Sequence, residues 1–195
     1  MGINMEKVNE IPSSPLDVFL LPAWVHKKIS IKLEGLILAF LFVGIFDFVF
    51  HRNLIEEGFF QGDVGNIILK FFLGIVISIV IGAYDVICTM APISGFATMI
   101  GNRSEKYVNP RLPVILMKSY ALSHLIFIIP SALFVYSGVD WLTVDMNSPM
   151  KTRMLFSILI VVLNFMPYFQ LGIIYRTISI RTRIQVFGKL ILILA

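Results

Sequence analysis

The chain has 195 residues, of which 57% are hydrophobic and only 14% are charged, and its mean hydropathy is +0.87. Soluble domains carry about 25% charged residues, so this composition excludes an ordinary soluble domain and predicts an integral membrane protein. The net charge of +4 fits basic loops that face anionic lipid head groups rather than nucleic acid. The single cysteine, Cys88, excludes an intramolecular disulfide.

Residues 1–32 are predicted to form a cytoplasmic segment that precedes a transmembrane helical bundle over residues 33–195. Its stretch from Leu16 to Ile31 mixes apolar side chains with His26, Lys27 and Lys28. This mixture predicts an amphipathic stretch at the membrane interface, with Trp24 at head-group depth. Docking of a protein partner on the same stretch is an alternative that the sequence leaves open.

A first membrane span is predicted from Leu33 to Phe50, with Asp47 near its far end. Asp47 precedes His51 by four residues and therefore shares a helix face with it. Such a pair can bind a proton or a metal ion, but no third ligand type lies nearby. A local interfacial hydrogen bond is the preferred interpretation, and no metal site is predicted.

The second predicted span, Asn66 to Met90, carries the most informative pattern. At about 100° per residue, one helix face collects three small and two charged side chains, which are Gly74, Ser78 and Gly82 with Lys70 and Asp85. Small residues four apart let neighbouring helices approach closely in a membrane. We therefore predict that this helix is central to the bundle and packs through the small residues.

A third span is predicted from Leu112 to Tyr136. It has Lys118 near its start, His124 near its middle and Pro130 beyond. The proline predicts a kink. A lone intramembrane histidine is more often an interhelical hydrogen-bonding group than a catalytic one.

A fourth span is predicted from Met154 to Tyr175, where Asn164 is expected to face the bundle. The stretch 184–195 is apolar but has only twelve residues, against about twenty for a full span. It gives a short and uncertain fifth span. The predicted fold is therefore an all-α, polytopic bundle of five spans.

Basic residues fall on alternate connections between these spans. One set contains ten of them: Lys7, Lys27, Lys28, Lys32, Arg103, Lys106, Arg111, Arg176, Arg181 and Arg183. The opposite set contains only Arg52, Lys151 and Arg153. The positive-inside rule then predicts a cytoplasmic N-terminus.

This topology offers a partner to each intramembrane charge. Asp47 and Lys70 are expected near one membrane face, and Asp85 and Lys118 near the other. Two interhelical ion pairs, Asp47 with Lys70 and Asp85 with Lys118, would offset the cost of placing these charges in the membrane.

The stretch APISGFATMIGNRSEKYVNPRLPVILMKSYALSHLIFIIPSALF joins a small-residue-rich helix end to a short basic turn and a further helix. Within it, KSYALSHLIFIIP resembles the third helix of Yip family membrane proteins, and the later PYFQLGIIYRTIS is similar to the turn before their last helix. The resemblance covers roughly residues 15–195. It implies a five-helix membrane protein with a cytoplasmic N-terminus, of a family linked in eukaryotes to Rab GTPases and vesicle traffic. The acidic-Leu-Tyr-Gly-Pro signature of eukaryotic members is absent, so only the fold is carried over.

No P-loop, GxGxxG, HExxH or CxxC motif occurs, so neither an enzyme nor a cofactor is predicted. One hypothesis is a scaffold or adaptor, with the basic connection from Ser94 to Arg111 as its cytoplasmic contact surface. Its contact residues would be Arg103, Lys106 and Arg111, and its partners anionic lipid together with a protein or a second copy. The alternative is a small transporter component with Asp85, His124 and Asn164 along a polar path. Short loops and an Ile- and Phe-rich composition favour a bacterial inner membrane, and an organelle membrane is the alternative that the sequence leaves open.

Overall fold

The computed structural model describes residues 17–50, 61–104, 108–137 and 139–184, and this part of the chain forms helices and turns but no strand. In chain order the helices are α1 (Asp17–Leu20), α2 (Ala23–Lys28), α3 (Leu36–Phe50), α5 (Val64–Arg103), α6 (Leu112–Ser123), the 3-10 helix η1 (His124–Phe127), α7 (Ile128–Tyr136) and α8 (Met150–Arg181). The predicted all-α class is therefore confirmed for the described residues.

Three helical stretches are long and apolar enough to cross a membrane: α5, the continuous path of α6 and η1 into α7, and α8. The first predicted span becomes α3, which has only 15 residues and is about 22 Å long, against a hydrocarbon core of about 30 Å. The predicted fifth span lies outside the described residues, apart from Ile184.

Helix α5 continues well beyond its predicted end. The span was predicted to stop at Met90, but the helix runs to Arg103 with Pro92 inside it. Proline has no N–H for the carbonyl four residues earlier, here that of Cys88, and membrane helices tolerate this loss where neighbouring groups satisfy the carbonyl. The basic connection expected from Ser94 to Arg111 is consequently shorter, because its first ten residues belong to α5.

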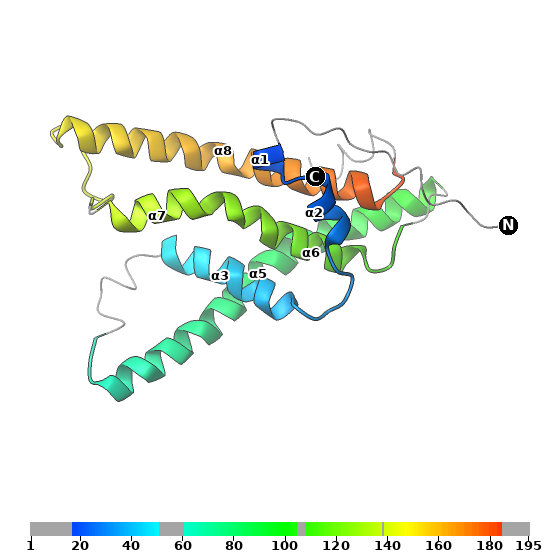
Figure 1. Cartoon of the computed structure of the whole chain (residues 1–195), viewed down its shortest axis with the longest axis horizontal. Coiled ribbons are helices and arrows are strands. Elements are labelled where there is room, and N and C mark those ends of the chain that lie inside the picture. Colours follow the sequence, from blue (N-terminus) through cyan, green and yellow to red (C-terminus); the bar gives the residue numbers. More distant parts are fainter. Residues whose placement is uncertain (1–16, 51–60, 105–107, 138, 185–195) are drawn as a thin grey trace.

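The helices divide the molecule into two ends (Figure 1). Helices α7 and α8 lie side by side, while α3 and α5 form a second pair that diverges from them at the start of α5. We call the "head" the end where α1 and α2 lie against α8, where α5 ends and where α6 begins. The "far end" is the opposite one, where α7 ends and α8 begins.

The apolar core gathers at the head. Met90 of α5, Leu112 and Leu116 of α6, and Ile174 and Ile178 of α8 form one cluster of fully or almost fully buried side chains. By contrast, the first half of α5 exposes large apolar side chains such as Phe72 and Val80, as expected of a surface that faces lipid.

Close contact between α3 and α5 depends on two glycines. A Cβ atom added to Gly82 would clash with the Phe40 backbone oxygen, and one added to Gly44 would clash with the Ser78 backbone oxygen. Gly74, Ser78 and Gly82 all lie on the buried face of α5. The structure thus places Ser78 and Gly82 at the interface with α3 and buries Gly74 on the same face of α5.

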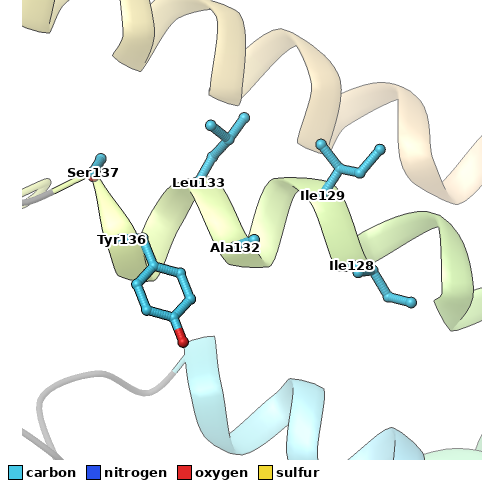
Figure 2. A pocket seen from close by; sticks show the side chains of 6 residues that line it. All are labelled: Ile128, Ile129, Ala132, Leu133, Tyr136 and Ser137. Carbon is cyan, nitrogen blue, oxygen red and sulfur yellow. The ribbon is translucent and has the colours of Figure 1, made fainter.

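The third span is interrupted near its middle, where α6 passes through the 3-10 turn of η1 into α7. Pro130 follows this turn and has no N–H to offer to the preceding helical turn. Beyond the interruption, α7 presents a shallow apolar groove in which Ile129 and Leu133 point toward α8 (Figure 2).

Candidate functional site

The head holds an N-terminal strap, which we define as residues 17–34. Its first anchor is the ion pair between Arg176 of α8 and Asp17, with 2.6 Å between Nη1 and Oδ1. The same Nη1 donates to the Leu21 carbonyl at 3.0 Å. Leu21 has a φ of +61°, a left-handed conformation that L-residues other than Asn and Asp rarely adopt. Arg176 thus stabilises a sharp turn between α1 and α2.

Arg181 forms the second anchor, at the end of α2. Its guanidinium donates to three backbone oxygens of the strap, those of His26 at 3.0 Å, Lys27 at 2.7 Å and Ile29 at 2.8 Å. The last carbonyls of a helix have no intrahelical donor, and a cation there also favours the helix dipole. Arg181 therefore caps α2 from a neighbouring helix.

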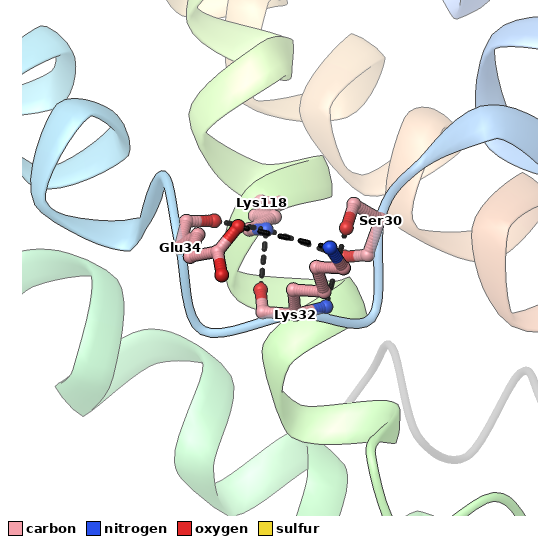
Figure 3. Close-up of polar contacts among 4 residues, drawn as sticks. All are labelled: Ser30, Lys32, Glu34 and Lys118. Atoms are coloured by element: carbon pink, nitrogen blue, oxygen red, sulfur yellow. Dashed lines mark hydrogen bonds and ion pairs between the residues drawn. The ribbon is translucent and has the colours of Figure 1, made fainter.

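Lys118 of α6 forms the third anchor. Its ammonium donates to the carbonyls of Lys32 at 2.6 Å, Glu34 at 2.7 Å and Ser30 at 3.3 Å (Figure 3). Gly35, with a φ of +83°, lets the backbone curve around this ammonium and into α3. The lysine therefore fixes the path from the strap into the first apolar helix.

A buried row of polar side chains lies between these anchors. His26 is fully buried; its Nδ1 lies 2.7 Å from Thr177 Oγ1 and its Nε2 lies 3.0 Å from the Leu20 carbonyl. The Thr177 hydroxyl also contacts the Ser119 hydroxyl of α6. All of these contacts are satisfied if Nε2 carries the proton and Thr177 donates to Nδ1. The row thus joins the strap, α6 and α8 through a neutral imidazole.

The environment of His26 favours that neutral form. Burial lowers the pKa of His26 below its ordinary value of 6.5, and the positive charges of Arg176 and Arg181 lower it further, while the carbonyls of Leu20 and Leu21 partly oppose the shift. Desolvation penalises the charged imidazolium. The strap is therefore bound with an uncharged histidine at its centre.

The outer surface of the head carries exposed cations. Lys27 and Lys28 lie on α2, with the Lys28 ammonium 5.2 Å from the centre of the Trp24 ring. Arg103 and Arg111, two of the predicted contact residues, are both exposed at this end. Lys106, the third, lies outside the described residues. The head thus presents basic groups on a surface that the strap anchors hold in place.

The predicted ion pair between Asp85 and Lys118 is wrong. The long stem of Lys118 carries its ammonium to the strap carbonyls instead, and the ion pairs among the described residues are Asp17–Arg176 and an exposed Lys32–Glu34 contact of 3.9 Å. Lys70 likewise has a different partner from the predicted Asp47, because its ammonium donates to the Gln61 carbonyl at 2.8 Å. Neutral carbonyls cost less to desolvate than a second buried charge.

The polar path proposed for transport forms only in part. Asp85 accepts a hydrogen bond from Thr89 at 3.3 Å and lies close enough to His124 to act on it electrostatically. The buried His124 bonds the Tyr120 carbonyl at 2.9 Å. Asn164, however, is exposed and donates to the Ile160 carbonyl of its own helix at 2.8 Å. The expectation that Asn164 faces the bundle is wrong, because an i−4 carbonyl satisfies its amide on the outer surface of α8.

Of the residues at the strap interface, only Lys118 was predicted as a site residue, and with Asp85 as its partner. Arg176 and Arg181 count only toward the positive-inside rule in the sequence, and His26 only toward an amphipathic stretch. In the sequence, the one local indication of polar contacts at this helix end is that Arg176 and Thr177 directly follow the apolar span. Among the described residues no cluster of His, Cys, Asp or Glu side chains is suited to holding a metal ion.

Searches for similar proteins gave no match to a family model, to a curated protein or to a solved structure.

Proposed function

We propose that this chain is a non-enzymatic membrane scaffold of the Yip-like type, whose head engages a protein partner or anionic lipid at the cytoplasmic face of a bacterial inner membrane. One observation carries the proposal: Arg176, Arg181 and Lys118 bind the strap to the head through seven hydrogen bonds to its backbone oxygens and one ion pair with Asp17. A surface fixed in this way presents its remaining cations with little loss of entropy on binding.

The distribution of packing supports a contact surface at this end. The main buried cluster lies at the head, while the first half of α5 leaves its apolar side chains exposed. A stable protein surface outside the hydrocarbon needs such a core, because lipid does not cover it. The exposed Arg103 and Arg111 are suited to acidic partners and anionic head groups.

Photo-crosslinking in native membranes tests the scaffold. A photo-reactive residue replaces Asn102, which is exposed at the end of α5, and a matched one replaces Asn147, exposed at the far end. We expect a discrete protein adduct from position 102 and none of the same mass from position 147. Lipid adducts and self-adducts alone from position 102, or the same protein from both, would argue against a scaffold at the head.

A second candidate, a transporter component, is favoured by one observation. The third span is broken by η1 where His124 lies near Asp85, and discontinuous helices with intramembrane ionisable groups are a feature of transporters. Proton flux into proteoliposomes would test it with Asp85→Asn and His124→Gln, against Asn164→Leu as a control on the outer surface. Equal flux through all three variants and the native chain would exclude a proton path through this pair.

A further inference from the structure

A pocket at the far end is enclosed by α7, the connection that follows it and the start of α8. Its volume is about 320 Å³, within the range of about 300–1,000 Å³ typical of small-molecule sites. Trp141 closes one side; its ring is buried and stacks on Phe156 with 6.1 Å between centroids and 22° between planes. The walls also include Ser137 and Lys151, so the pocket combines apolar surface with a hydroxyl and a cation.

The pocket adjoins the apolar groove along α7, which has a volume of about 410 Å³. Leu133 and Ser137 line both hollows. From there the groove continues past Ala132 to Ile129, whose side chain points toward α8 as Leu133 does (Figure 2). The combined hollow is thus polar at the end of the helices and apolar toward the middle of the span.

The cation at the mouth of this hollow has no carboxylate partner among the described residues, whose ion pairs lie at the head. The nearby loop carboxylates are engaged locally. Asp145 accepts hydrogen bonds from the Asn147 backbone and amide and from the Ser148 hydroxyl, and Asp140 accepts one from the Leu142 N–H. Lys151 is therefore available to an anion, on the side of the protein where the sequence carries few basic residues.

We propose that the hollow binds one anionic glycerophospholipid, with its phosphate at Lys151, its ester region beside Ser137 and an acyl chain along Leu133 and Ile129. The charge at the mouth complements the phosphate, and the apolar groove runs in the direction that an acyl chain takes from the interface into the bilayer. This site lies at the opposite end from the proposed scaffold surface and does not depend on it.

Native mass spectrometry of the full chain in detergent tests the proposal with added dioleoyl-phosphatidylglycerol or zwitterionic dioleoyl-phosphatidylcholine. The variant Lys151→Gln removes the cation. Arg153→Gln is the matched control. Arg153 has the same charge and lies on the same turn of α8, but it does not line this pocket. Leu133→Trp fills the hollow at the residue that its two parts share, where the side chain is 48% exposed and the fold has room for it.

We expect one retained phosphatidylglycerol per chain, with Lys151→Gln weakening its binding about fivefold, the factor that corresponds to about 1 kcal/mol for one basic residue near an anionic surface. Arg153→Gln should leave binding unchanged, and Leu133→Trp should remove the retained lipid. Equal losses of lipid binding in Lys151→Gln and Arg153→Gln would mean that the effect comes from general surface charge, and this would overturn the proposal. Retention that is indifferent to Leu133→Trp, or equal for the two lipids, would also overturn the proposal.

Discussion

His26 and Thr177, 151 residues apart in the sequence, form a buried hydrogen bond of 2.7 Å that joins the N-terminal strap to the last turns of α8. Around this bond, three basic side chains bind the backbone of the strap. The head of the protein is therefore held together by polar contacts between the two ends of the described chain, above an apolar core.

Replacing the hydroxyl of that bond should loosen the strap. Thr177→Val keeps the side-chain shape but leaves His26 Nδ1 and the Ser119 hydroxyl without this partner, and an unsatisfied buried polar group costs about 1–3 kcal/mol. We expect a lower Tm in detergent. Thr98→Val is the control, because the exposed Thr98 bonds only the Ser94 carbonyl of its own helix. An equal Tm for both variants would mean that the buried row contributes no stability.

Strap docking should weaken in acid. The folded pKa of His26 lies below its value of 6.5 in the unfolded strap, so the docked state binds fewer protons. Its stability is fully present above about pH 6.5 and falls as the pH drops through the folded pKa. The direct partners of the imidazole, which are the Thr177 hydroxyl and the Leu20 carbonyl, do not titrate in this range.

Hydrogen exchange of the strap amides between pH 8 and pH 5, corrected for intrinsic rates, measures this effect. Protection should decline with acid in the native chain and stay level in His26→Gln, which cannot gain the proton. A native strap whose protection is the same at both pH values would contradict the neutral-histidine arrangement.

The glycine contact between α3 and α5 should tolerate no added methyl group. In Gly82→Ala the new Cβ meets backbone atoms of Phe40 and Gly44, which cannot rotate away, so the helices must separate and lose about 1–3 kcal/mol of packing. Gly95→Ala, on the same helix with no atom within 4 Å of the added Cβ, should be neutral or stabilising by up to about 1 kcal/mol. Thermal unfolding of both variants compares them; a harmless Gly82→Ala would refute the close contact.

Removing the Lys118 ammonium should release the path from the strap into α3. In Lys118→Met the carbonyls of Ser30, Lys32 and Glu34 lose their shared donor, at a cost of about 1–3 kcal/mol because the donor is charged. Faster hydrogen exchange is expected at residues 30–36, with α8 unchanged. Lys32→Met, which removes only an exposed contact of 3.9 Å, should not accelerate it; the same acceleration in both variants would assign the effect to lost charge.

Much of the bundle follows from patterns within single helices. The third span matches its predicted bounds from Leu112 to Tyr136, and the four-residue spacing of Gly74, Ser78 and Gly82 marks the buried face of α5. Hydrophobic periodicity identifies the buried face of a helix because residues three or four apart lie on the same side of it. Periodicity did not locate the end of α5, which runs past Pro92 to Arg103.

The partners of polar side chains could not be predicted in the same way. Charge matching paired Lys118 with Asp85, but the Lys118 ammonium donates to three strap carbonyls instead. Every residue has a backbone carbonyl, so the sequence does not show which of them accepts a hydrogen bond. The pairing of His26 with Thr177 likewise depends on how the strap folds back onto α8. Asn164 was expected to face the bundle, yet its amide donates to the Ile160 carbonyl of its own helix.

The most direct test of the account is the side of the membrane on which the head lies, since a cytoplasmic scaffold requires the head inside. In a Cys88→Ala background, Asn102→Cys and Asn147→Cys each provide one exposed thiol, at the head and at the far end. A membrane-impermeant maleimide added to intact cells should label position 147 and reach position 102 only after permeabilisation. Labelling of position 102 in intact cells, with position 147 protected, would contradict the proposed function.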